Sequence, residues 1–253
     1  MRARAERDVV GDQALRVVDL SKSFGGVHAL RGVSLDISRG QILGIIGPNG
    51  AGKTSLVNAI SGRERPTAGS VMLDGLDVTG RSPDYLSRRG LTRSYQQSNI
   101  FAEASVEENL ARAAEFAGRR AVGVDAHLQA TGLDAVLNSR SGSLPYGLQK
   151  MLGLVMSLST GPSVVLMDEP AAGLEAGERP QVDRLVATCA EGGCAVLIVE
   201  HDMDMIRRLC PTVMVLDAGA LLAAGPTAEV LARPDVLAAY LGVGDTESES
   251  SDG

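Results

Sequence analysis

The chain has few of the residues that bind nucleic acids or build metal and disulfide frameworks. Its 253 residues include no Trp, three Phe and four Tyr, and its formal net charge is −7. Nucleic-acid binders present basic surfaces to phosphates and aromatic rings to bases, so DNA and RNA are disfavoured as partners. The three cysteines, Cys189, Cys194 and Cys210, lack metal-ligand spacing, and we expect reduced, partly buried thiols in a cytosolic protein.

Long hydrophobic runs are also absent. The longest uncharged stretch, residues 151–167, is interrupted by Gly161-Pro162 and is shorter than the roughly 20 residues that a membrane-spanning helix needs. It predicts a buried helix, a turn and a buried strand. The N-terminal segment is charged and has no apolar core region, which indicates neither a secretory signal nor a transit peptide. We expect the chain to stay outside the bilayer, where it can still lie against a protein that crosses it.

Lysine is scarce too, with three in the chain, and one of them completes a phosphate-binding motif. Residues 47–54 read GPNGAGKT, the G-x-x-x-x-G-K-[ST] pattern, here called the phosphate loop. An apolar run precedes it and a helical stretch, 53–60, follows it, as such a loop requires. Glycines let backbone N–H groups surround phosphates, Lys53 reaches the β and γ oxygens, and Thr54 holds Mg²⁺. The predicted nucleotide-binding residues are Gly47, Asn49, Gly50, Ala51, Gly52, Lys53, Thr54 and Ser55.

Hydrophobic patterning divides the chain between two polar ends, residues 1–13 and 244–253, which we expect to be flexible or disordered. Short apolar strands and glycine turns fill the first third, and alanine- and leucine-rich helical sequence fills residues 105–159. Strands then alternate with helices. The strands predicted after Pro162 span residues 164–167, 195–199 and 213–216. This alternation predicts parallel strands with crossover helices, and therefore an α/β fold.

Two adjacent carboxylates, Asp168 and Glu169, follow the first of these later strands. They stand at its carboxyl end, where α/β sheets place their ligands. Taken alone, they are better interpreted as a solvated strand end. With a phosphate loop in the same chain, Asp168 is placed to hold Mg²⁺, and Glu169 to orient or deprotonate an attacking water.

Together with further segments in a fixed order, these motifs resemble the ATP-binding cassette of ABC transporters over nearly all of residues 14–243. The matching segments are GPNGAGKT (47–54), TRSYQ (92–96), LPYGLQ (144–149), VVLMDEP (164–170), AGLE (172–175) and VEHDM (199–203). The resemblance implies a P-loop NTPase with a RecA-like core, an N-terminal antiparallel β subdomain and a helical subdomain inserted at about 97–159. It also implies a head-to-tail dimer holding two ATP molecules with Mg²⁺.

The resemblance assigns roles to three side chains outside the phosphate loop. Phe24 is expected to stack on adenine, with an ordinary core phenylalanine as the alternative. Gln96, which is hard to tell from its neighbour Gln97, is expected to contact Mg²⁺ and water and to link the core to the helical subdomain. His201 is expected to be the switch residue that contacts the γ-phosphate.

The signature, residues 144–149, departs from the family pattern. Tyr146 and Gly147 are expected to contact the ATP of the other subunit, but Pro145 replaces the usual serine and Leu148 a polar residue. The segment after the carboxylates ends in Glu175-Ala176 where Asp or Asn and Pro are common. These departures leave this chain's own nucleotide residues intact and predict a heterodimer with two unequal sites.

Several stretches resemble the branched-chain amino acid importers in particular, among them DEPAAGLE, IVEHDM and the pattern of residues 225–242. Urea-type importers and the lipopolysaccharide-export ATPase are similar in the same places, so the cargo rests on analogy. The resemblance implies the ATP-hydrolysing subunit of an importer for branched-chain amino acids or similar small polar solutes. Such a subunit is peripheral, at the cytoplasmic face of the inner (plasma) membrane, with permease subunits and a second cassette as partners.

Three questions stay open at this level. Ile100 and Phe101, beside Gln96, are either permease contacts or core residues. The chain is alternatively a regulatory or structural nucleotide-binding subunit with weak hydrolysis. A third possibility is a soluble cassette ATPase of cluster assembly or DNA repair, which the acidic charge and the importer-like ending disfavour.

Overall fold

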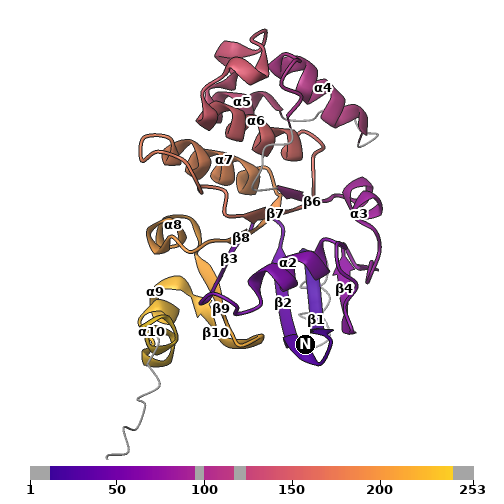
Figure 1. The fold of residues 1–253 in the computed structure, drawn as a ribbon, viewed down its shortest axis with the longest axis vertical. Coiled ribbons are helices and arrows are strands. Elements are labelled where there is room, and N and C mark those ends of the chain that lie inside the picture. The colour runs from indigo at the N-terminus through magenta and orange to yellow at the C-terminus, as the bar shows by residue number, and fades with distance from the viewer. Residues whose placement is uncertain (1–11, 95–99, 117–123, 242–253) are drawn as a thin grey trace, which may run out of the picture.

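The computed structural model describes residues 12–94, 100–116 and 124–241, which form two sheets and a group of helices (Figure 1). The strands are β1 (Gln13–Phe24), β2 (Val27–Ser38), β3 (Ile42–Ile46), β4 (Ala68–Leu73), β5 (Leu76–Asp77), β6 (Leu91–Ser94), β7 (Val164–Asp168), β8 (Ala195–Val199), β9 (Thr212–Asp217) and β10 (Ala220–Pro226). The helices are α2 (Lys53–Ile60), α3 (Pro83–Arg89), α4 (Val106–Phe116), α5 (Val124–Thr131), η1 (Leu133–Val136), η2 (Ser141–Ser143), α6 (Tyr146–Leu158), α7 (Arg179–Glu191), α8 (Met203–Leu209), α9 (Thr227–Leu231) and α10 (Pro234–Leu241). None of these helices is long and apolar enough to cross a membrane.

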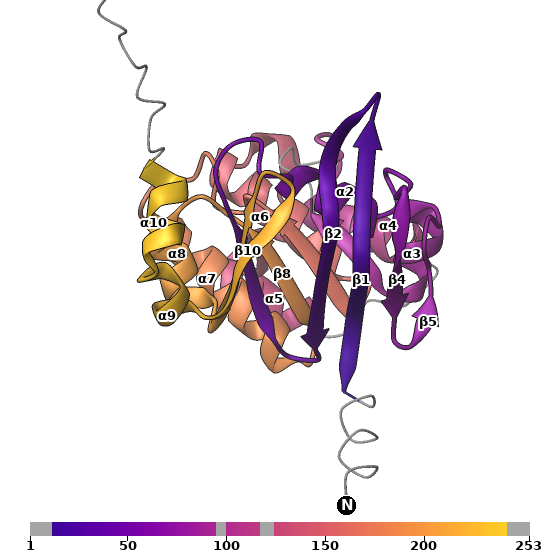
Figure 2. The same ribbon diagram turned by 90° about the horizontal axis from the view of Figure 1, so that it is seen from below.

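The first sheet is antiparallel, with the strand order β2-β1-β4-β5. Its two long strands, β1 and β2, run side by side in Figure 2 and are joined by a tight turn at Gly25-Gly26. Both glycines have positive φ, 50° and 92°, which hairpin turns favour. Phe24 ends β1 at this turn and is 47% exposed, so it is not a core residue.

The second sheet carries the parallel strands, with the order β10-β9-β3-β8-β7-β6. Its strands β6, β7, β8, β3 and β9 are parallel, and β10 is an antiparallel edge strand. All five residues of β8 are buried, as expected for a parallel strand covered on both faces. The predicted α/β architecture is confirmed. Because β3 is flanked by β8 and β9, the loop that follows β3 opens at the middle of the sheet's carboxyl edge.

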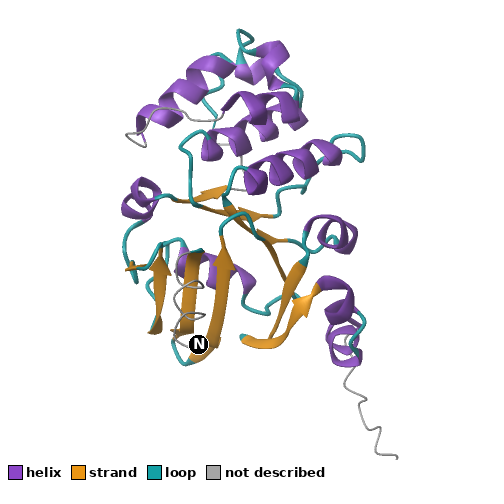
Figure 3. Cartoon of the chain, turned by 180° about the vertical axis from the view of Figure 1, so that it is seen from behind, coloured by secondary structure: helices purple, strands orange, loops and turns teal. Residues whose placement is uncertain are grey.

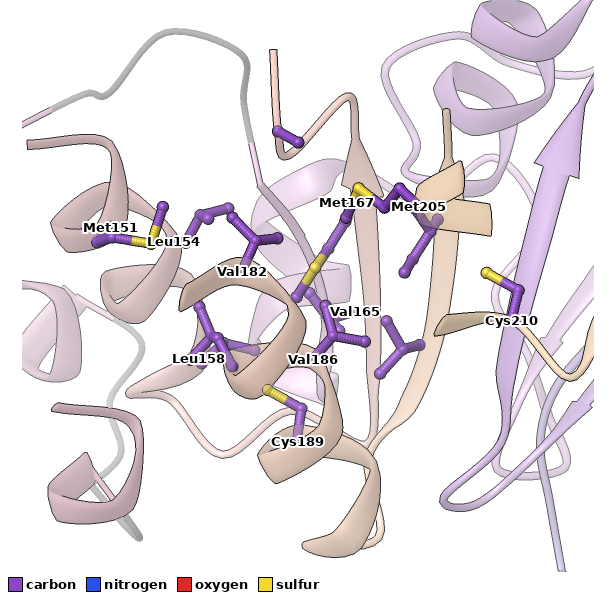
Figure 4. Packing of buried hydrophobic residues seen from close by; sticks show 14 of the residues in the cluster. Met151, Leu154, Leu158, Val165, Met167, Val182, Val186, Cys189, Met205 and Cys210 are labelled. Carbon is purple, nitrogen blue, oxygen red and sulfur yellow. The ribbon is translucent and has the colours of Figure 1, made fainter. Parts of the chain in front are cut away.

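Helices cover one side of this sheet in two successive layers. Figure 1 shows α4, α5 and α6 together, with α7 lying nearer the sheet, and Figure 3 shows the same arrangement from behind. The shared core contains Met151, Leu154 and Leu158 on α6, Val182 and Val186 on α7, and Val165 and Met167 on β7 (Figure 4). Packing against α7 thus ties α6 to the strand that ends in Asp168.

All three cysteines are free thiols, as expected. They are buried, whereas the sequence predicted partial burial. Burial raises the pKa of the Cys194 and Cys210 thiols to about 12 each and that of Cys189 further. Most of the polar ends, residues 1–11 and 242–253, lies outside the described residues, and their flexibility stays a prediction.

Candidate active site

The phosphate loop leaves the end of β3 and enters α2 through positions where only glycine fits. Gly47 has a φ of 151°, and a Cβ there would lie 2.2 Å from the carbonyl oxygen of Leu216. Gly52, with a φ of 99°, caps α2, and its Cβ would lie 2.6 Å from the carbonyl oxygen of Ala29. Both positions combine left-handed backbone with close approach of another chain segment. The motif glycines are therefore required by this backbone before any ligand is considered.

Lys53, the first residue of α2, folds back over the loop. Its Nζ donates to the carbonyl oxygens of Gly47, at 2.6 Å, and Pro48, at 2.9 Å. Burial lowers the pKa of this ammonium group, while the negative charges of Glu169 and Asp168 act to raise it. The structure thus brings the predicted lysine and both predicted carboxylates into one electrostatic site. Of the other loop residues, Asn49, Gly50 and Thr54 are exposed.

Asp168 ends β7 and forms an ion pair that the sequence did not reveal. Arg93 Nη2 lies 2.7 Å from Asp168 Oδ2, and the two side chains are 7% and 14% exposed. Arg93 also donates from Nη1 to Asn58 Oδ1, at 2.7 Å, on α2. One guanidinium group therefore joins β6, β7 and the helix that follows the phosphate loop. The available signal was an arginine inside the TRSYQ segment.

Glu169 and His201 lie together beyond the ends of neighbouring strands. His201 Nδ1 is 3.6 Å from Glu169 Oε1, and the side chains are 69% and 32% exposed, respectively. Glu169 has a φ of 48°, an unusual left-handed conformation for a residue other than glycine. Lys53, Asp168, Glu169 and His201 therefore gather at the carboxyl edge of the core sheet. Gln96 falls in residues 95–99, outside the described residues, so its predicted role is not tested.

The signature residues stand at the start of α6, away from the phosphate loop in Figure 1. Pro145 caps this helix without a side-chain hydrogen bond, and Tyr146 is 56% exposed. Gly147 is buried because the Glu178 side chain lies over it: a Cβ there would be 1.9 Å from Glu178 Oε1. The signature does not join the Lys53 cluster of its own chain, an arrangement compatible with a contribution to another subunit.

Two buried charged residues near this site were missed by sequence reasoning. Lys150, on α6, is 4% exposed, and Glu200, directly after β8, is 2% exposed. Both contact the backbone of residues 169–172. Their signals were faint: a lysine within an otherwise apolar helix and a carboxylate directly after an apolar strand.

A glycine-rich loop between strand and helix, with two carboxylates at the end of another parallel strand of the same sheet, defines a P-loop protein that binds nucleoside triphosphates. The family model "ABC transporter" matches residues 30–172. The chain belongs to this family as an ATP-binding subunit, an ATPase coupled to transport.

Curated relatives extend the likeness along most of the chain. The high-affinity branched-chain amino acid transport ATP-binding protein BraF of Pseudomonas aeruginosa is 35% identical over 248 residues, covering 90% of this chain and 97% of BraF. LivG of Escherichia coli K12, with the same description, is 33% identical over 248 residues, covering 90% of this chain and 97% of LivG. The methionine import ATP-binding protein MetN of Caulobacter vibrioides is 36% identical over 225 residues, covering 85% of this chain and 68% of MetN.

Solved structures agree with the fold. The ADP conformation of MJ1267, an ATP-binding cassette of an ABC transporter, superposes with a TM-score of 0.81 at 28% identity, covering 91% of this chain and 99% of MJ1267. CbiO1 of Clostridium perfringens, part of the transporter complex CbiONQ, gives 0.76 at 27% identity, covering 89% and 93%. The predicted P-loop NTPase fold with an antiparallel β subdomain is confirmed.

Proposed function

We propose that this chain hydrolyses ATP to drive an importer for branched-chain amino acids or similar small polar solutes. The observation that carries the proposal is the gathering of Lys53, Asp168, Glu169 and His201 at one edge of the core sheet. The cargo is supported by BraF and LivG, which match almost to their full length and are described as branched-chain amino acid transport proteins. MetN is equally similar in identity, so methionine is the nearest competing cargo.

The residues present fit a magnesium ion. Thr54 is exposed in the first turn of α2, and Asp168 ends β7, so both offer the hard oxygen ligands that Mg²⁺ prefers. Thr54 and Asp168, together with Gln96, would hold the ion. When bound, Mg²⁺ supplies positive charge that neutralises the β- and γ-phosphate oxygens.

The remaining side chains bind the nucleotide and position water. Lys53 already directs its ammonium group at two loop oxygens, and phosphate oxygens would take their place as acceptors. Phe24, exposed at the end of β1, offers its ring to adenine. Glu169 would accept a proton from, or orient, the attacking water, while His201 beside it would contact the γ-phosphate.

In the proposed assembly this chain pairs head to tail with a second cassette and sits peripherally on permease subunits at the cytoplasmic face of the inner membrane. The start of α6, with Tyr146 and Gly147, would complete the partner's nucleotide site. The helical layer around α4 to α6 would form the inserted subdomain. Because Pro145 offers no hydroxyl there, the second candidate function is a regulatory or structural nucleotide-binding subunit that contributes little to hydrolysis.

Two variants test the proposal in the transporter complex purified through a tag on this chain. Lys53→Ala should abolish ATP binding, whereas Glu169→Gln should retain ATP but block its turnover. Glu191→Gln, an exposed carboxylate at the end of α7, is the matched control and should hydrolyse ATP like the parent. Parent-rate hydrolysis by Glu169→Gln would overturn the role of Glu169. Uptake of labelled leucine and of methionine into membrane vesicles distinguishes the two cargoes.

A further inference from the structure

Two buried charges of opposite sign lie on either side of the segment that carries Glu169. Lys150 comes from the first turns of α6, and Glu200 follows β8. Both side chains are almost fully buried, at 4% and 2% exposure. Burying a charge is unfavourable unless other groups pair or hydrogen-bond with it. The groups that bond to Lys150 and Glu200 therefore indicate the role of these two buried charges.

Lys150 holds the carbonyl side of this segment. Its Nζ donates to the backbone oxygen of Glu169, at 3.3 Å, and to that of Ala172. Burial lowers the pKa of the Lys150 ammonium group, and the negative charges of Glu200 and Glu169 oppose that change. The negative charges of Glu200 and Glu169 thus favour the charged form of Lys150.

Glu200 holds the amide side. Its Oε1 accepts from the N–H of Ala171, at 3.2 Å, and its Oε2 accepts from the N–H of His201, at 3.1 Å. One carboxylate therefore joins the segment after Glu169 to the segment that carries the proposed switch histidine. A shift in either segment would break a buried hydrogen bond.

The backbone of Glu169 needs such support. Its φ of 48° costs a residue other than glycine free energy, and such conformations persist only where the surroundings impose them. The Glu169 N–H donates to Val199 O, at 2.9 Å, and its carbonyl accepts from Lys150. The direction of the Glu169 side chain therefore depends on contacts with β8 and α6.

We propose that Lys150 and Glu200 form a buried brace, a pair of positioning residues that fixes residues 169–172 so that Glu169 meets its water. The brace also links the start of α6, which carries the signature, to His201. A movement of the signature would therefore shift Glu169 in the same chain. This inference rests on the proposed role of Glu169.

The test compares Lys150→Met, Glu200→Gln and the double variant in the transporter complex purified through a tag on this chain. Each single change leaves one buried charge without its counterpart and should lower the Tm, by about 5 °C or more. The kcat for ATP should fall about 10- to 100-fold through misplacement of Glu169, while ATP affinity changes less than about threefold. The double variant removes both charges, so its Tm should recover. Its kcat should stay low, because the donor to the two carbonyls is still missing.

A purely structural role predicts a different pattern. Recovery of kcat together with Tm in the double variant would overturn the brace, and so would a Lys150→Met kcat within about twofold of the parent. Glu169→Gln, measured alongside, separates the two proposals. If it turns over ATP at the parent rate, the assignment of Glu169 fails. If it is inactive while Lys150→Met is fully active, only the brace fails.

Discussion

The guanidinium group of Arg93 lies 2.7 Å from the carboxylate of Asp168, and neither side chain is more than 14% exposed. The same guanidinium group donates to Asn58 on α2. Asp168 therefore has a fixed cationic partner within its own chain, besides the positive charge of Lys53 nearby. A metal ion at this carboxylate would be held by a side chain whose direction is already set.

The first prediction is that removing Arg93 destabilises the folded chain, because it breaks the ion pair with Asp168. We expect Arg93→Leu to lower the free energy of unfolding by about 3 kcal/mol, because it leaves Asp168 largely buried without its partner. The Tm, measured by differential scanning fluorimetry, should fall by roughly 6–12 °C. Added Mg²⁺ should restore part of this loss, since a cation can take up position beside Asp168.

Arg207→Leu is the control for this prediction, because its pair with Asp204 is exposed. It should change stability by less than about 0.5 kcal/mol. Equal losses in the two arginine variants would show that the Arg93–Asp168 pair is no stronger than a surface ion pair.

The signature proline makes a second prediction. Pro145 caps α6 without a side-chain hydrogen bond, where a serine would offer a hydroxyl to the partner's nucleotide. A hydrogen bond to a charged group contributes about 1.5–3 kcal/mol, so Pro145→Ser should accelerate hydrolysis at the partner's site by about tenfold. Pro226→Ser is the matched control, because Pro226 caps α9 in the same way. It should leave the ATPase rate of the complex unchanged.

The same reasoning predicts that the two sites of the proposed dimer are unequal. Glu169→Gln should reduce the ATPase rate of the complex more than the equivalent change in the partner. Equal losses, or a larger loss from the partner's variant, would contradict this asymmetry. A Pro145→Ser complex that hydrolyses ATP at the parent rate would show that backbone N–H groups around Gly147 suffice.

The third prediction concerns the surface beside the predicted Gln96 loop. Phe101 is 53% exposed and lies under the Arg112 guanidinium group, 4.8 Å from its ring centroid, whereas Ile100 packs against the core. The buried Asn109 bonds both backbone groups of Phe101, which fixes where the ring is presented. We expect Phe101→Ala to keep its Tm but to lose permease co-purification or transport-stimulated ATPase activity.

Leu237→Ala tests whether any exposed apolar side chain has this effect. Leu237 is 49% exposed on α10, at the opposite end of the molecule in Figure 1. It should keep permease binding. Unchanged behaviour of Phe101→Ala in both assays would remove Phe101 from the proposed permease contact.

The fourth prediction concerns pH. Burial lowers the pKa of His127, whose Nε2 lies 3.5 Å from Cys189 Sγ. The unfolded chain therefore takes up this proton at higher pH than the folded chain does, so stability falls as the pH drops below about 6.5. Tm measured between pH 7.5 and 5.5 should decline less steeply in His127→Gln than in the parent. His28→Gln, at an exposed histidine bonded to Ser23, should keep the parental slope.

Sequence patterns correctly located the helices and strands that begin after a glycine-containing turn and contain a run of apolar residues. The helix at 53–60 and the strand at 195–199 have the predicted bounds. A glycine-containing turn precedes each of them, and each buries apolar side chains. The apolar residues at 15–20 and 33–37 predict two short strands, and both strands are longer in the structure. β1 continues to Phe24 and β2 begins at Val27, because pairing between them orders polar and exposed residues that have no apolar pattern.

The site shows the same division. The phosphate loop and Asp168-Glu169 were found because their chemistry depends on residue type and spacing along the chain. Arg93, Lys150 and Glu200 were missed because their contacts depend on burial and on distant backbone groups that only the folded chain brings near. A lysine or glutamate in the sequence is most often solvated, so neither stood out.

The position of β3 has a consequence for synthesis of the chain. Both strands that pair with β3 come from residues 195–217, although β3 itself ends at Ile46. During translation the phosphate-loop sequence emerges early, but its supporting ladder forms only after most of the polypeptide has left the ribosome. A nascent chain that ends before these strands therefore carries the motif without the strands that pair with β3. We therefore expect chains that end before β9 to bind ATP poorly.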